Sequence, residues 1–361
     1  MKKAILFLLM LCLYTISAYS SNHIYLIIGS YSNGTTPGIS VYDFNIQSGD
    51  FSSIRETRNI VNPSYLVVSP DEKRIYSVNE TQQGAVSAFH FDKTTGTLSF
   101  INSQLTEGAN PCYINMDTGQ NFIVTANYSG GSISYFPLTK EGAIEPLHKV
   151  WNIDSLSHIH TAVFSPDNKY LFVTDLGLDK IYKFNVEADH SLTFDTENIT
   201  SLPVGSGPRH LAFHPNGKFL YCINERNGTV SAFNYQHGML TAIHTIDSDI
   251  NPDSKRKGSA DIHLTPNGKF LYSSNRLRED GIAIFSVDSK KGRLKKVGYQ
   301  KTGIHPRNFI ISPNGKFLLC ANRNSNNVQI FEINQKTGLL HDTGKEIVLD
   351  QPVCLKWVTK Q

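Results

Sequence analysis

Short apolar runs separated by turn-forming residues fill the chain after about residue 20. The stretch Gly207–Phe233, GPRHLAFHPNGKFLYCINERNGTVSAF, shows the pattern clearly. It predicts a strand at Arg209–His214, a Pro-Asn-Gly-Lys turn, a second strand at Phe219–Asn224 and a third from Thr229. Aromatic and β-branched residues favour strands, whereas proline, asparagine and glycine favour turns. The prolines and glycines at the breaks exclude one continuous helix.

The same strand–turn–strand pattern recurs along the chain at intervals of roughly 50 residues. Its copies begin at Pro63, Pro111, Ile159, Pro208, Ala260, Pro306 and Pro352. A repeat of this length that is filled with strands is typical of a β-propeller, in which each repeat forms one four-stranded blade. We therefore expect an all-β, seven-bladed β-propeller.

The seventh copy is divided between the two ends of the chain. Pro352–Trp357 supplies only a first strand, and the N-terminal segments His23–Gly29, Gly38–Phe44 and Phe51–Ile60 match the other three strands. We expect the N- and C-terminal strands to share one blade and close the ring, which removes open sheet edges. No linker indicates a second domain, so residues 21–361 are expected to form one propeller domain.

The first 20 residues are interpreted as a secretory signal peptide. Lys2 and Lys3 precede the apolar run Ala4–Ile16, which is short for a membrane span, and Ala18–Ser20 offers small residues for cleavage. We therefore expect an exported protein, periplasmic or secreted, without membrane attachment once the signal peptide is removed. The formal charge of +3 falls to +1 without the two lysines, which argues against a broad nucleic-acid or membrane-binding surface.

Four cysteines remain after the signal peptide: Cys112, Cys222, Cys320 and Cys354. An oxidising compartment would permit disulfides. However, Cys222 and Cys320 hold equivalent positions in repeats that are not neighbours. We favour buried thiols over disulfides, because free cysteine often serves as a small core residue.

Polar residues that break the repeat gather at one predicted end of the channel. In a blade, residues just before the first strand and just after the second lie at the same end. The residues of this kind are His158, His160, Arg209, Glu225, Arg276, His305 and Arg307. Several like charges around a channel are costly unless an anion neutralises them, so they predict a binding site. The asparagines that recur after the second strands are expected to cap turns instead.

Other kinds of chemistry find less support in the sequence. His158 and His160 lie two apart on a predicted strand and could share a metal, but no third ligand accompanies them at a recognisable spacing. We expect no metal and no cofactor. The glycine-rich segments precede no helix, and Pro203 interrupts the only approach to a Gly-x-Ser-x-Gly motif, so a phosphate loop or a serine triad is not expected.

Together these motifs resemble the lactonase-type seven-bladed propellers, the family that includes bacterial propeller-type 6-phosphogluconolactonase and fungal carboxy-cis,cis-muconate cyclase. The resemblance spans about Ile24 to Trp357. It is carried by NPSYLVVSPD, ANYSGGSIS, HIHTAVFSPDNKYLFVTDLGLDKI, GPRHLAFHPNGKFLYCINE, SSNR and HPRNFIISPNGKFLLCANRNSNNV. In the cyclase branch a histidine, two arginines and a glutamate act at the channel mouth. By motif position they resemble His160, Arg209, Arg276 and Glu225.

The resemblance implies a lactone hydrolase of the 6-phosphogluconolactonase type. Hydrolysis needs a water, a base and donors for the oxyanion. We expect Glu225 or His160 to be the base, and Arg209 and Arg276 to stabilise the anion. The expected substrate-binding residues are His158, His210, His305, Arg307 and Arg323. The predicted export leaves open another sugar lactone or muconolactone outside the cytoplasm, or a non-catalytic binding propeller. A monomer is expected.

Overall fold

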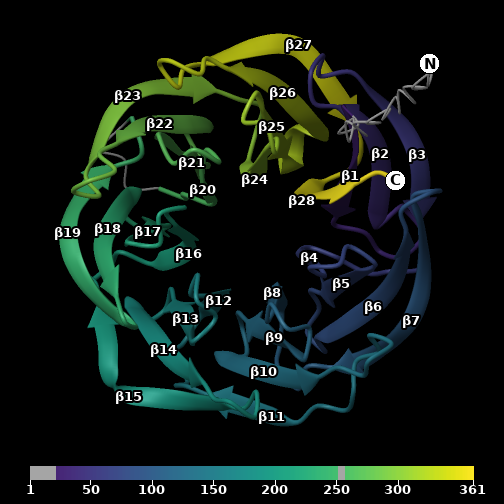
Figure 1. Ribbon diagram of the computed structural model, residues 1–361, viewed down its shortest axis with the longest axis vertical. Coiled ribbons are helices and arrows are strands. Elements are labelled where there is room, and N and C mark those ends of the chain that lie inside the picture. Colours follow the sequence, from purple (N-terminus) through teal and green to yellow (C-terminus); the bar gives the residue numbers. More distant parts are fainter. Residues whose placement is uncertain (1–21, 251–256) are drawn as a thin grey trace, which may run out of the picture.

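The structure, a computed structural model, describes residues 22–250 and 257–361, so the predicted signal peptide lies outside the described residues. Seven antiparallel sheets of four strands each surround a central axis (Figure 1). One short 3-10 helix, Arg323–Ser325, accompanies the strands. The prediction of an all-β, seven-bladed propeller is confirmed. Within the described residues, no helix is long and apolar enough to cross a membrane.

Each blade contributes one strand to the wall of the channel and three further strands outward. The innermost strands are β4 (Leu66–Val68), β8 (Pro111–Met116), β12 (Ile159–Phe164), β16 (Pro208–Phe213), β20 (Ile262–Leu264), β24 (Pro306–Ile311) and β28 (Pro352–Thr359). The second strands are β1 (His23–Ser30), β5 (Arg74–Asn79), β9 (Phe122–Asn127), β13 (Tyr170–Asp175), β17 (Phe219–Asn224), β21 (Phe270–Asn275) and β25 (Phe317–Asn322).

The third strands are mostly buried, whereas the outermost strands are the more exposed ones. The third strands are β2 (Ile39–Asn45), β6 (Ala85–Asp92), β10 (Ser132–Pro137), β14 (Lys180–Val186), β18 (Thr229–Gln236), β22 (Gly281–Val287) and β26 (Asn327–Ile333). The outermost strands are β3 (Phe51–Thr57), β7 (Thr97–Leu105), β11 (Lys149–Asn152), β15 (Leu192–Ser201), β19 (Met239–Asp247), β23 (Leu294–Lys301) and β27 (Leu340–Val348).

The ring closes as the sequence predicts. Strand β28 pairs antiparallel with β1, from Ile24 opposite Thr359 to Ser30 opposite Pro352. The two ends of the chain therefore meet in one sheet, in the order β28-β1-β2-β3. In Figure 1 the C-terminal strand lies between the N-terminal strand and the channel.

Apolar residues of the second and third strands pack between neighbouring blades. Buried tyrosines of the second strands add a hydrogen bond from one blade to the next. Tyr76, Tyr221 and Tyr272 each donate to the carbonyl of a glycine in the outer turn of the following blade, over 2.8, 3.1 and 2.8 Å. Because a buried tyrosine hydroxyl needs a partner, these bonds fix the spacing between blades.

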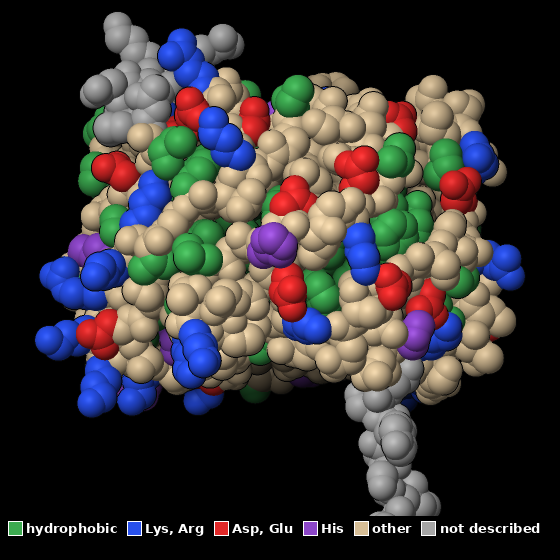
Figure 2. All heavy atoms as spheres, turned by 90° about the horizontal axis from the view of Figure 1, so that it is seen from above, with side chains coloured by type: hydrophobic (Ala, Val, Ile, Leu, Met, Phe, Trp, Pro, Cys, Tyr) green, Lys and Arg blue, Asp and Glu red, His purple; other side chains and the backbone are tan. Residues whose placement is uncertain are grey.

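The four cysteines in the described residues are all buried free thiols, which confirms that interpretation of the sequence. On the outer wall of the drum, acidic and basic side chains are interspersed among apolar ones (Figure 2). Lys and Arg side chains gather towards the left edge of this view, whereas the two signs of charge alternate over the rest of it (Figure 2).

Candidate active site

One residue from each blade lines the channel near the start of the innermost strand. In five blades this residue is the extra residue of a β-bulge, because Pro208 and His210, for example, pair with adjacent residues of β17 and leave Arg209 between them. A bulge re-aims a side chain out of the regular alternation. The seven equivalent positions, which we call the channel ring, are Ser64, Cys112, His160, Arg209, Asp261, Arg307 and Val353.

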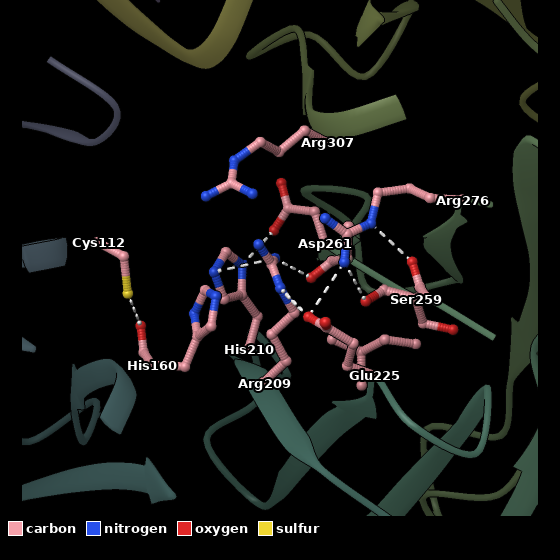
Figure 3. Close-up of polar contacts among 12 residues, drawn as sticks. Cys112, His160, Arg209, His210, Glu225, Ser259, Asp261, Arg276 and Arg307 are labelled. Carbon is pink, nitrogen blue, oxygen red and sulfur yellow. Dashed lines mark hydrogen bonds and ion pairs between the residues drawn. The ribbon is translucent and has the colours of Figure 1, made fainter. Parts of the chain in front are cut away.

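Two arginines hold one carboxylate at the mouth, the end of the channel where the innermost strands begin. Arg209 Nε lies 2.8 Å and Arg276 Nη2 lies 3.0 Å from the same oxygen of Glu225, Oε2 (Figure 3). Burial alone would raise the pKa of Glu225, but Arg276 and Arg209 outweigh it and hold that pKa below its usual value. Glu225 is therefore a carboxylate, with 26% of its side chain exposed towards the mouth.

Backbone carbonyls fix the two arginines further. Arg209 donates from Nη1 to the carbonyl of Ala260 over 2.5 Å, and Arg276 donates from Nε to the carbonyl of Gly258 over 2.7 Å. Burial lowers the pKa of Arg276 to about 10, because Arg209 and Arg307 add repulsion that Glu225 only partly offsets. The Arg276 guanidinium therefore stays charged at neutral pH.

His160 lies beside this cluster, and its side chain is buried. Its ring is 5.1 Å from the ring of His210 and 5.7 Å from that of Tyr128, centre to centre. Burial first, and then the charges of Arg209 and its neighbours, hold the pKa of His160 well below its usual value. His160 is therefore a neutral imidazole at physiological pH, able to accept a proton.

His210 is oriented by a carboxylate of the channel ring. Its Nδ1 lies 2.7 Å from Asp261 Oδ1, and its Nε2 lies 3.4 Å from Arg209 Nη1. Asp261 also accepts hydrogen bonds from His263 and Asn308, over 2.9 and 2.5 Å. Burial lowers the pKa of His210 to about 4, so a neutral ring donates to Asp261. His210 forms part of the floor beneath the arginines.

The remaining cationic residues line the mouth on the other side of Glu225. Arg307 lies 3.7 Å from Glu80 and over the ring of Tyr31. Arg323 lies 4.7 Å from the centre of the same ring, in a hollow of about 620 Å³. Tyr31 donates to Glu80 over 2.9 Å. The four arginines of the mouth lie among the carboxylates of Glu225, Glu80 and Asp350, the last of which lines the same hollow as Arg323. Their planar guanidiniums suit an anionic ligand such as a carboxylate or a phosphate.

The structure brings together most of the predicted site residues. His160, Arg209, His210, Glu225, Arg276, His305 and Arg307 form one cluster, in which His305 Nε2 lies 3.4 Å from Arg276 Nη1. Arg323 lies to one side, in the hollow beside Tyr31. His158 stacks on Tyr128 at 4.7 Å between ring centres, and Tyr128 separates its ring from that of His160.

The recurring asparagines serve the repeat, but Asn127 and Asn224 bond side-chain hydroxyls of the third strand rather than the backbone of a turn. Asn224 donates to Thr229 Oγ1 over 2.8 Å and to Ser231 Oγ over 2.9 Å, and Asn127 bonds the equivalent serines of its own blade. No group of three histidine, cysteine or carboxylate side chains is arranged to hold a metal in the part of the chain that the structure describes.

Three contributors escaped prediction from the sequence: Ser64, Cys112 and Tyr31. Ser64 and Cys112 occupy the same position of the repeat as Arg209, directly after the proline that begins each of these copies, so that position was the available signal. Nothing in the local sequence distinguishes Tyr31 from any other tyrosine at the end of a strand. A wider hollow, of about 750 Å³, lies around Arg74 away from this cluster, but Arg74 is already bonded to the carbonyls of Lys140 and Glu141.

Comparison with known proteins agrees with this geometry. A family model described as lactonase, 7-bladed beta-propeller, matches residues 25–357. A 6-phosphogluconolactonase of Formosa agariphila is 40% identical over 356 residues, which cover 92% of this chain and 99% of the relative.

Two solved structures are also similar to this chain over most of its length. A candidate 6-phosphogluconolactonase of Bacteroides fragilis is 48% identical, with a TM-score of 0.89, over 94% of this chain and 99% of that one. The periplasmic gluconolactonase of Pseudomonas aeruginosa is 30% identical, also with a TM-score of 0.89, over 94% of this chain and 100% of that one.

Proposed function

Because the chain belongs to the lactonase family of seven-bladed β-propellers, we propose that it hydrolyses 6-phospho-D-glucono-1,5-lactone to 6-phosphogluconate. The observation that carries the proposal is the Arg209–Glu225–Arg276 cluster with neutral His160 beside it at the channel mouth. The similarity to the Formosa agariphila 6-phosphogluconolactonase supports the choice of substrate.

His160 acts as the general base in this proposal. A base must offer an unprotonated lone pair within reach of the attacking water. Glu225 has its Oε2 committed to two guanidiniums, whereas His160 Nδ1 has no partner among the described residues. The geometry therefore favours His160. The negative charge that develops on the lactone offsets the repulsion between a protonated His160 and the arginines.

Arg209 and Arg276 stabilise the oxyanion. Guanidinium donors held in a water-poor site before the reaction need little reorganisation when charge develops. Their bonds to Glu225 and to the carbonyls of Ala260 and Gly258 hold them in place. Glu225 is thus a positioning residue, which also keeps two neighbouring cations together.

Arg307 and Arg323 bind the phosphate end of the substrate. Planar guanidiniums suit the oxygens of a phosphate, and both lie over Tyr31 on the same side of the mouth. Arg307 lines the channel as well as contacting Glu80, so it connects the hollow around Arg323 with the reaction centre.

A second candidate substrate is an unphosphorylated gluconolactone outside the cytoplasm. The similarity to the periplasmic gluconolactonase of Pseudomonas aeruginosa favours it, and so does the signal-peptide pattern of residues 1–20. Export to the periplasm or beyond is part of this second proposal.

The test compares purified mature protein with spontaneous hydrolysis on three substrates: 6-phosphogluconolactone, gluconolactone and a muconolactone. Preferential acceleration of the phosphorylated lactone supports the proposal. Acceleration of gluconolactone alone supports the second candidate. Acceleration of none of the three would refute the lactonase function and favour a binding propeller.

A further inference from the structure

A small cavity lies under the arginine cluster on the channel axis. Its walls and floor are formed by Ser64, Tyr65, Cys112, His160, Arg209, His210, Arg307, Asn308 and Val353. The space that the centre of a water-sized sphere can reach is about 10 Å³, which is close to the room that one water molecule needs. Six of the seven channel-ring residues contribute to the wall.

Two polar atoms in the lining are buried without a partner. Neither Ser64 Oγ nor His160 Nδ1 has a hydrogen-bond partner among the residues that the structure describes. Ser64 is 2% exposed and His160 is 4% exposed. Buried polar groups are nearly always satisfied by protein or by ordered water. A water between these two groups would satisfy both, and Arg209 and Arg307 provide further donors in the same wall.

We propose that this cavity binds the water that attacks the lactone, and that Ser64 positions it. The proposal rests on the lactonase function above. Ser64 Oγ and His160 Nδ1 would hold the water from two sides beneath the arginines. Ser64 thereby becomes a further residue of the reaction centre, supplied by the one blade whose channel-ring residue is a serine.

The chemical step balances with these groups alone. The water oxygen attacks the lactone carbonyl carbon, and its proton passes to His160 Nδ1. The tetrahedral oxyanion lies against Arg209 and Arg276. When it collapses, the bond from the carbonyl carbon to the ring oxygen breaks, and the ring oxygen takes the proton from His160 and leaves as a hydroxyl. The products are the open-chain acid and the regenerated imidazole.

The thiol in the same wall does not offer a competing covalent route. Cys112 Sγ lies 3.5 Å from the carbonyl oxygen of His160 and 3.8 Å from that of Ile159. Burial raises the pKa of Cys112, which keeps it a neutral thiol at physiological pH. Since the thiolate is the nucleophilic form, water is the nucleophile that this cavity favours.

The test is Ser64→Ala in the full mature chain, with two readouts. We expect kcat to fall about tenfold with KM nearly unchanged, because one hydrogen bond to the attacking water is lost. We also expect a high-resolution crystal structure of the wild type to show water density between Ser64 Oγ and His160 Nδ1, and that density to weaken or move in the variant.

The matched control is Ser77→Ala on β5. Ser77 is an equally buried serine of the same blade, but its hydroxyl donates to the carbonyl of Val78 and lies outside the cavity lining. Its kcat should equal that of the wild type.

A dry cavity in an active wild type, or a Ser64→Ala variant with unchanged kcat, overturns the proposal and leaves the lactonase function standing. A wild type that accelerates no lactone overturns the function itself, and the role of this water with it. The crystallographic readout therefore separates the two failures.

Discussion

The channel ring has two arcs that share a backbone position but differ in chemistry. The charged arc is Arg209, Asp261 and Arg307 together with the neutral imidazole of His160, and the small arc is Val353, Ser64 and Cys112. Bulges occur in both arcs, so the fold aims side chains at the axis without regard to their type. In the charged arc the long side chains of Arg209 and Arg307 extend towards the axis. The short side chains of the small arc leave space on the opposite side of the channel. A nearly symmetric fold thereby acquires an asymmetric reaction centre.

The sharpest test of the charged arc is His160→Asn. Removing a general base reduces turnover by about a hundredfold to ten-thousandfold, and kcat should fall by that amount if His160 takes the proton of the water. The fall in rate at low pH, which reports protonation of the base, should then be absent from the pH–rate profile. His190→Asn, in an exposed hairpin turn, is the control and should keep wild-type kcat. Near-normal turnover in His160→Asn would place the base elsewhere.

Arg209→Ala tests the oxyanion role of the same arc. Loss of one preorganised donor should reduce kcat by about a hundredfold or more, with the fold retained as judged by circular dichroism. Lys269→Ala, in an exposed turn at the opposite pole, should leave kcat unchanged. An unaltered rate in a folded Arg209→Ala protein would contradict the role.

Glu225→Gln separates positioning from base catalysis. If Glu225 only holds Arg209 and Arg276, we expect kcat to fall about tenfold, because the charge-assisted contacts weaken. The acid limb of the pH–rate profile should stay in place, since it reports His160. A profile that loses its acid limb in this variant would instead make Glu225 the base.

Arg323→Gln tests the substrate end of the mouth. KM for 6-phosphogluconolactone should rise about tenfold, since one charge-assisted contact to phosphate is lost, whereas KM for gluconolactone should change little. An equal rise in KM for both lactones would show that Arg323 does not bind the phosphate.

The smallest expected effect is the loss of folding stability at low pH. His210 and His305 have folded-state pKa values of about 4 and about 3, below the unfolded value of 6.5, chiefly because of burial. Between these values and about pH 6.5 the folded state binds fewer protons than the unfolded state, so stability falls as the pH falls through this window. The melting temperature should drop by a few degrees from pH 7 to pH 4, measured by calorimetry.

The matched variant for this prediction is His305→Gln, in which the melting temperature should depend less on pH. The control is His341→Gln, a substitution at an exposed position. A melting temperature that stays constant from pH 7 to pH 4 in the wild type would contradict the lowered pKa values of His210 and His305 in the folded state.

The repeat determined the fold, and it determined which end of the channel carries the chemistry. Strand β17, Phe219–Asn224, lies where the pattern predicts it, and the two chain ends meet in one blade because a truncated last copy leaves an edge that only the first strand can cover. Arg209, Glu225 and Arg276 were recognisable as residues that break the repeat. Local strand and turn preferences, repeated several times, suffice for this much.

Only the tertiary structure decided which side chains touch. The contact of Arg276 with Glu225 joins two blades, and the cavity between Ser64 and His160 joins two blades that are separated by a third. Such proximity depends on how far each bulge turns its residue towards the axis and on how much space the neighbouring side chains fill. Because those quantities arise from packing around the closed ring, no single repeat contains them.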